Sequence, residues 1–171
     1  MPDLRAALKA CPIAAILRGV KPNEIDAIGD ALVEAGITII EVPLNSPNPV
    51  ESIKRLAARH GARALVGAGT VLEVADVARV SAAGGRLIVA PNFDADVVRA
   101  TKAAGLASLP GVMTPSEGFA ALKAGAAVFL SGATDDLLRR ADYYCIATEV
   151  KVVVVHCCIQ DSGNSASAQQ Q

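Results

Sequence analysis

The chain has 171 residues and a formal net charge of −1 at pH 7. This length fits one domain better than two, and the balanced charge gives no field that would attract nucleic acid or an anionic membrane surface. Apolar residues make up 52% of the chain but aromatic residues only 3%, so Ala, Val, Leu and Ile must build the core.

The first ten residues carry Asp3, Arg5 and Lys9 and contain no long apolar run, so they do not have the pattern of a secretory signal. No stretch reaches the roughly 18 uncharged apolar residues of an ordinary membrane-spanning helix. We therefore expect a cytoplasmic protein with no nucleic-acid partner and no membrane partner.

Short apolar, β-rich runs recur along the chain, each followed by a segment rich in Ala and charged residues. Runs of this kind are typical of strands buried on both faces of a parallel sheet. They begin near Ala14, Thr38, Ala64, Leu87, Ala107 and Ala126. The predicted helices between them cover residues 22–35, 50–60, 74–83 and 94–104, and each stops at a glycine.

Six consecutive βα units favour an α/β fold of the TIM-type (β/α) barrel class over an open doubly wound sheet. A flavodoxin-like sheet is the structural alternative. Gly67 and Gly69 could begin a dinucleotide-binding G-x-G-x-x-G, but Leu72 stands at the position of its third glycine.

Candidate site residues stand where the predicted strands end, which is where a barrel carries its chemistry. Glu41 lies inside an apolar run, and burying its carboxylate is costly unless the group is paired or functional. Desolvation would raise the pKa of Glu41 toward that of a general acid or base. The alternative is a structural ion pair with Arg18.

Arg18 ends the first run, where a guanidinium can hold a carboxylate or phosphate, or can simply be solvated in a loop. Thr70 follows small residues that let an anionic ligand approach, or it caps the next helix. Pro91 ends the fourth run. Thr114 or Ser116 fits the N-cap of a further helix, with a proline in the first turn.

Five motifs occur in order: ILRG (16–19), EVPLNSP (41–47), GAGTVL (67–72), IVAPN (88–92) and PGVMTPSE (110–117). Together they resemble the 2-keto-3-deoxy-6-phosphogluconate and 6-phosphogalactonate aldolases over about residues 8–129. The EVPLNSP string looks like the phosphogalactonate branch, since the phosphogluconate branch usually has an arginine where Asn45 stands.

The resemblance implies a homotrimeric (β/α)8 barrel and a class I aldolase with no metal and no cofactor. A lysine on the sixth strand would form a Schiff base with a phosphorylated keto-deoxy sugar acid, which is cleaved to pyruvate and D-glyceraldehyde 3-phosphate. By resemblance, Glu41 shuttles protons and Arg18 and Thr70 hold the pyruvyl carboxylate. Pro91 and Thr114 belong to the substrate pocket.

The sequence departs from the family where that lysine belongs. The family pattern places Leu130 at its position, and leucine cannot form an imine. Lys123 and Lys151 lie nearby but match no family position, and we find no counterpart of the glycine-rich phosphate loops expected after the seventh and eighth strands. The alternative function is therefore a catalytically inactive, truncated or frame-shifted family member.

Composition changes at the same point, because both tyrosines and three of the four cysteines follow residue 130. We expect a barrel portion over residues 1–130 and an atypical segment over 131–171, either diverged or translated out of frame. That segment is expected to hold a helix over 135–144, a strand over 150–159 and a disordered tail. His156 and Cys158 can share one strand face, but two ligands are too few for a metal. An incomplete barrel would leave open strand edges at its first and last strands.

Overall fold

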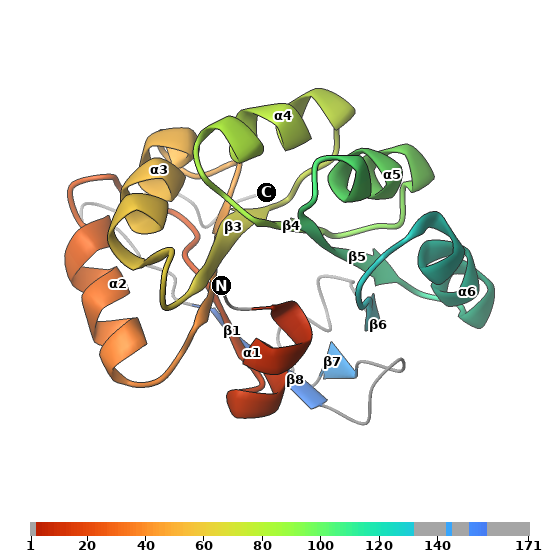
Figure 1. Ribbon diagram of the computed structural model, residues 1–171, viewed down its shortest axis with the longest axis horizontal. Coiled ribbons are helices and arrows are strands. Elements are labelled where there is room, and N and C mark those ends of the chain that lie inside the picture. The colour runs from red at the N-terminus through yellow and green to blue at the C-terminus, as the bar shows by residue number, and fades with distance from the viewer. Residues whose placement is uncertain (1–2, 132–142, 145–150, 157–171) are drawn as a thin grey trace, which may run out of the picture.

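The computed structural model describes residues 3–131, 143–144 and 151–156 (Figure 1). Helices and strands alternate through most of this range, as the repeating sequence pattern predicts. In chain order the elements are α1 (Leu4–Ala10), β1 (Ile13–Ile16), α2 (Ile25–Glu34), β2 (Ile39–Pro43), α3 (Pro49–His60), β3 (Leu65–Gly69), α4 (Val74–Ala82), β4 (Leu87–Ala90), α5 (Ala95–Ala103), β5 (Ala107–Val112), α6 (Pro115–Ala124), β6 (Leu130–Ser131), β7 (Tyr143–Tyr144) and β8 (Lys151–His156). The four predicted inter-strand helices are confirmed as α2 to α5.

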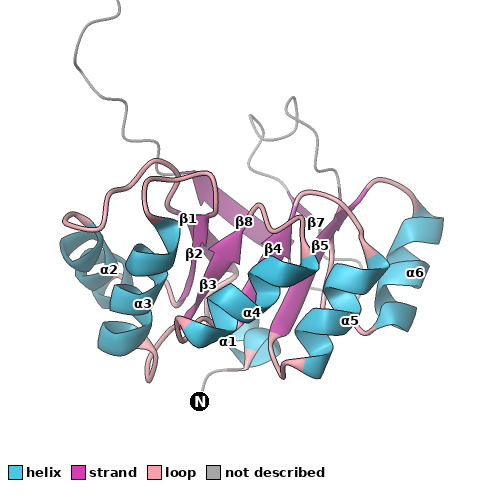
Figure 2. Cartoon of the chain, turned by 90° about the horizontal axis from the view of Figure 1, so that it is seen from above, coloured by secondary structure: helices cyan, strands magenta, loops and turns pink. Residues whose placement is uncertain are grey.

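Strands β1 to β5 pair in parallel and in sequence order, which gives a half-barrel of the TIM type. Helices α2 to α6 lie along the outside of this curved sheet (Figures 1 and 2). The sequential order excludes the flavodoxin-like alternative, in which the strand order reverses at a switch point. None of the helices within the described ranges is long and apolar enough to cross a membrane.

The last three strands depart from the regular plan. β6 covers two residues and lies parallel to β5, so the predicted sixth unit is not confirmed as a full unit. β7 is antiparallel to both β6 and β8, whereas a (β/α)8 barrel has only parallel strands. β8 confirms part of the predicted strand over 150–159. Tyr143 and Tyr144 are extended rather than helical, and the rest of the predicted helix and tail, with Cys145, Cys157 and Cys158, lies outside the described residues.

The ring of strands closes because β8 pairs in parallel with β1, with Ile13 opposite Val153 and Ile16 opposite His156. The expectation of open edges at the first and last strands is therefore wrong, because β8 pairs with both β7 and β1. A valine-rich strand from the end of the chain covers the edge of β1 and satisfies backbone groups that would otherwise invite association. The fold is an incomplete TIM-type barrel whose sheet is closed by short, partly antiparallel strands.

Side chains alternate between two cores along each parallel strand. Ile39, Leu65 and Leu87 begin their strands facing the barrel interior, where they pack against Leu4 and Leu8 of α1. Helix α1 thus closes the N-terminal end of the barrel. The neighbouring positions face outward and pack on the helices in a second cluster that includes Ile40, Val42, Val66, Ile88, Ile25, Ile53 and Leu56.

Candidate active site

Glu41 lies inside the barrel, because its neighbours Ile40 and Val42 both belong to the outward-facing core. It is two residues closer to the C-terminal end of β2 than Ile39, and its side chain is buried, with the residue only 4% exposed. Its Oε2 atom has no hydrogen-bond partner among the described residues. Desolvation raises the pKa of Glu41 to about 8, and the charge of Arg18 opposes that rise.

The structure does not bear out the structural ion pair between Glu41 and Arg18. Within the described residues no Arg18 nitrogen lies within 4.0 Å of a carboxylate oxygen. Instead the Nη1 atom of Arg18 donates to Oδ1 of Asn45 at 3.1 Å. The Gly19 N–H donates to Oγ of the buried Ser46 at 3.2 Å. The loop after β2 therefore holds the loop after β1 in place and orients the Arg18 guanidinium.

The contacts of Asn45 with Arg18 and of Ser46 with Gly19 were not predicted from the sequence, in which Asn45 served only to distinguish the two branches of the family. The position of both residues in the sequence could have marked them as candidates, because they lie directly beyond the end of β2, where ligand-binding groups of a barrel gather. Their partners, however, come from a strand end that precedes them by 27 residues in sequence. That approach depends on the parallel pairing of β1 with β2.

Thr70 directly follows β3 and has a left-handed backbone with φ of 56°. This conformation is costly for a β-branched residue, and strain of this kind gathers at functional sites. The alternative role of Thr70 as a helix cap is wrong, because α4 begins four residues later with Glu73 at its N-cap. The carboxyl of Glu41 lies against the backbone of Gly69, the preceding residue. The structure therefore brings Glu41 close to the end of β3.

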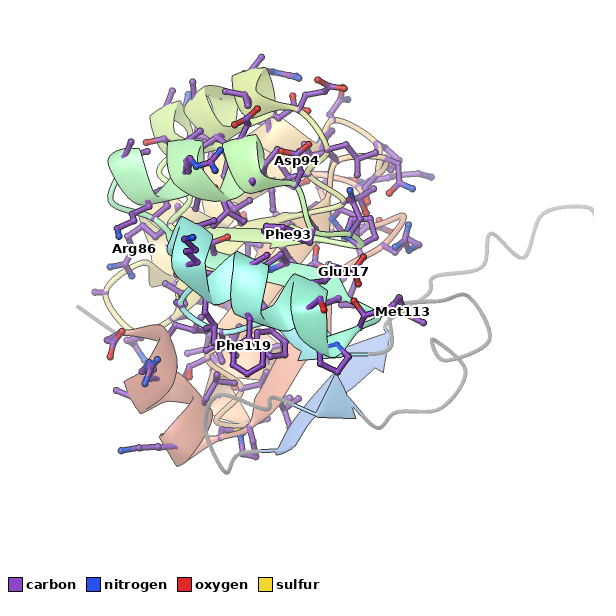
Figure 3. The ribbon with its side chains drawn as sticks, turned by 90° about the vertical axis from the view of Figure 1, so that its right-hand side faces the viewer. Arg86, Phe93, Asp94, Met113, Glu117 and Phe119 are labelled. Carbon is purple, nitrogen blue, oxygen red and sulfur yellow. The ribbon has the colours of Figure 1, made fainter. Side chains whose placement is uncertain are left out.

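Pro91 and Thr114 follow β4 and β5, and both are exposed. Thr114 is the N-cap of α6: its hydroxyl accepts from the Glu117 N–H at 3.2 Å, and Glu117 in return accepts from the Met113 and Thr114 N–H groups. These bonds lower the pKa of the Glu117 carboxyl. Figure 3 shows Met113 and Glu117 together where β5 passes into α6. The predicted capping role is confirmed for Thr114, and Ser116 is not the cap.

Leu130 faces the barrel interior and is only 7% exposed, in one cluster with Val128 and Leu109. The position that the resemblance gives to the Schiff-base lysine therefore carries an apolar side chain inside the barrel. Wherever the structure describes a lysine side chain, that lysine is exposed: Lys9, Lys21, Lys54, Lys102 and Lys123. Among these residues no amine reaches the barrel interior.

The family model of the KDPG and KHG aldolases matches residues 4–131. The probable 2-dehydro-3-deoxy-6-phosphogalactonate aldolase of Rhizobium meliloti is 49% identical over 115 residues, which cover 67% of this chain and 54% of that protein. The 2-dehydro-3-deoxy-6-phosphogalactonate aldolase of Escherichia coli is 43% identical over 115 residues, or 67% of this chain and 56% of that protein. This chain thus spans about half the length of these relatives.

Two solved structures agree with this assignment. A native KDPGal structure superposes with a TM-score of 0.71 at 39% identity, covering 74% of this chain and 61% of that one. The 2-keto-3-deoxy-6-phosphogluconate aldolase of Zymomonas mobilis, solved with 3-phosphoglycerate, gives a TM-score of 0.65 at 30% identity, covering 72% and 58%. On the matched motifs, the shared fold and the family model, this chain belongs to the KDPG and KHG aldolase family of lyases.

Proposed function

We propose that the strand-end site is built for 2-dehydro-3-deoxy-6-phosphogalactonate, which class I aldolase chemistry cleaves to pyruvate and D-glyceraldehyde 3-phosphate. The observation that carries this proposal is the buried carboxyl of Glu41, whose Oε2 is unpartnered among the described residues and whose pKa is raised to about 8. The names of the two relatives above and Asn45 in the EVPLNSP string favour the galactonate over the gluconate substrate.

Each candidate residue has a chemical role in this proposal. The planar guanidinium of Arg18, oriented by Asn45, donates two hydrogen bonds to the carboxylate of the pyruvyl part of the substrate. The Thr70 hydroxyl adds a third donor at the same end of the barrel. Pro91 and Thr114 form the outer rim of the pocket. Glu41 is mostly protonated at neutral pH, so it can give a proton to a water or a substrate oxygen and take it back.

Cleavage itself requires an amine. In class I aldolases a lysine forms an imine with the C2 ketone, and that imine accepts the electron pair of the breaking carbon–carbon bond. A second candidate function is therefore a non-catalytic family member that binds the keto acid without cleaving it. One observation favours it, namely the buried Leu130 at the position that the resemblance gives to that lysine.

Borohydride trapping separates the two candidates. The protein is incubated with pyruvate and sodium borohydride, which reduces an imine to a stable amine, and its mass is then measured. A covalent pyruvate adduct on any lysine, with cleavage of 2-dehydro-3-deoxy-6-phosphogalactonate, supports the aldolase. Saturable pyruvate binding without an adduct and without cleavage supports the non-catalytic member. Absence of pyruvate binding contradicts both.

The family resemblance also supports proposals about the protein as a whole. We propose a cytoplasmic homotrimer with a barrel portion over residues 1–130, a distinct segment over 131–171, and chemistry that needs neither metal nor cofactor. Sedimentation equilibrium measures the assembly state directly. A protein that stays monomeric at every concentration tested would contradict the trimer.

A further inference from the structure

The carboxyl of Glu41 occupies the space in which a side chain of residue 69 would begin. A Cβ atom built on Gly69 would lie 2.0 Å from Oε2, 2.3 Å from Cδ and 2.4 Å from Oε1 of Glu41. Contacts this short do not occur between non-bonded atoms, and the three nearest atoms all belong to that one carboxyl group. A glycine at position 69 is therefore what lets the carboxyl lie against β3.

The backbone of Gly69 gives no other reason for a glycine. The residue is extended in β3 opposite Pro43, and it is not among the glycines with positive φ, so other residues can adopt its conformation. Gly67 in the same strand differs, because a Cβ there would lie 1.9 Å from the backbone oxygen of Leu87. Gly67 serves the pairing of β3 with β4, whereas Gly69 accommodates Glu41.

The strand register shows in which direction Glu41 leans. Glu41 is opposite Gly67, yet its carboxyl touches the position of Gly69, two residues further toward the C-terminal end of β3. The side chain therefore points along the barrel toward the end that carries Arg18 and Thr70. If a side chain at residue 69 filled this space, the carboxyl would have to move toward the C-terminal end of the barrel or toward β1. The residues that follow β1 lead to Arg18.

We propose that Gly69 is a positioning residue for Glu41, because its missing side chain lets the carboxyl rest on the backbone of β3 inside the barrel, out of contact with Arg18. Its value for catalysis or keto-acid binding rests on the function proposed above. The placement of the carboxyl does not, and it can be measured without substrate.

Filling the space at residue 69 should lower the pKa of Glu41. In Gly69→Ala the carboxyl moves to a more hydrated position nearer the Arg18 guanidinium. Hydration and a closer positive charge both favour the ionised form, so the pKa of Glu41 falls from its value of about 8. A merely structural role for Gly69 would lower stability and leave this pKa unchanged.

Nuclear magnetic resonance titration of ¹³C-labelled glutamate side chains measures the midpoint of Glu41, which is assigned by its loss in Glu41→Gln. We expect the midpoint to fall by roughly one pH unit or more in Gly69→Ala. The control is Ala68→Gly, which changes the adjacent residue on the helix-facing side of β3. It should leave the midpoint unchanged. An unchanged midpoint in Gly69→Ala, or an equal fall in the control, overturns the proposal.

A double-mutant cycle keeps the proposal testable if Gly69→Ala folds poorly. The substitution is made with Glu41 present and in Glu41→Ala, and unfolding is followed in urea. We expect a clear loss of stability in the first background and a much smaller loss in the second, since the three atoms nearest to the added Cβ all belong to the Glu41 carboxyl. An equal loss in both backgrounds, or failure to fold in both, overturns the proposal.

Pyruvate titration of the parent chain by calorimetry separates this inference from the proposed function. A parent that binds no pyruvate contradicts the proposed function and leaves the midpoint comparison intact. With binding in the parent, we expect the affinity for pyruvate to change in Gly69→Ala and to persist in Ala68→Gly. If the parent binds pyruvate and the midpoint of Glu41 is unchanged in Gly69→Ala, the positioning role of Gly69 is contradicted, whereas the proposed function is not.

Discussion

The two ends of the barrel interior are built from different kinds of side chain. At the N-terminal end, Leu4 and Leu8 of α1 cover the first residues of the strands, which are the apolar Ile39, Leu65 and Leu87. At the C-terminal end, the interior holds the buried carboxyl of Glu41, and Thr70 is strained beside it. The first arrangement lowers the free energy of the folded chain and the second raises it. Stability and candidate chemistry are thus separated along one barrel, as in other proteins of this fold.

The largest effect is expected at the apolar end. Leu87→Ala removes a fully buried side chain from the cluster beneath α1, and we expect a loss of about 2–5 kcal/mol in the free energy of unfolding. Urea denaturation measures it. The matched control is Leu122→Ala on the exposed side of α6, with an expected change within about 0.5 kcal/mol. Equal losses at the two leucines would contradict the assignment of the apolar end as the source of stability.

The pH dependence of stability probes the polar end. Folding raises the pKa of Glu41 from 4.5 to about 8, so the folded chain binds more protons than the unfolded chain between these values. The resulting stabilisation is complete below about pH 4.5 and is lost as the pH rises through about 8. Within this window we expect Glu41 to account for a fall of about 1 kcal/mol per pH unit.

Glu41→Gln is the control for this slope, because glutamine keeps the shape of the side chain and does not titrate. The difference in unfolding free energy between the parent and Glu41→Gln, measured at several pH values, isolates the contribution of Glu41. Parallel pH profiles for the two proteins would mean that folding does not raise the pKa of Glu41.

The rim of the polar end depends on the cap of α6. Thr114→Ala removes both capping hydrogen bonds of the hydroxyl, and we expect a loss of about 1 kcal/mol in unfolding free energy. Thr114→Ser keeps the cap and should restore most of this stability. A change in pyruvate affinity in Thr114→Ser would assign the threonine methyl group to the pocket as well.

A smaller effect on stability is expected for the contact between the two loops. Asn45→Ala removes the hydrogen-bond acceptor of Arg18 at an exposed site, so the folded chain should lose less than about 0.5 kcal/mol. Pyruvate binding should weaken by roughly threefold to tenfold, since the freed guanidinium must be ordered by the ligand. Calorimetry that finds unchanged affinity in Asn45→Ala would remove Arg18 from the proposed carboxylate site.

Local patterns in the sequence predict the helices α2 to α5 and the position of Glu41, since glycine stops and buried apolar runs act over a few residues. The capping of α6 is equally local, because Thr114 and Glu117 are three residues apart. Thr70 was misassigned as a possible cap because its left-handed backbone arises from the path between β3 and α4, which residue type does not reveal.

Pairing between residues far apart in the sequence determines the closure of the sheet by β8 and the contacts between the loops after β1 and β2. The valine-rich run of β8 is recognisable as a strand, but its register against β1 joins residues more than a hundred positions apart, so the sequence period could not show that it covers this edge. The bonds from Arg18 to Asn45 and from Gly19 to Ser46 likewise exist only once β1 and β2 are paired. The division of the chain near residue 130 stays a prediction.

The central claim is that this chain has a keto-acid site of the aldolase type, and that none of the side chains that the structure describes supplies the amine that would attack the substrate. This claim favours the non-catalytic family member over the cleaving aldolase. Leu130→Lys places an amine at the interior position, and Leu130→Met serves as its apolar control. With pyruvate and borohydride, we predict no adduct on the parent or on Leu130→Met, and a single reduced pyruvate adduct at residue 130 in folded Leu130→Lys. An adduct on the parent, or none on folded Leu130→Lys, would contradict the account.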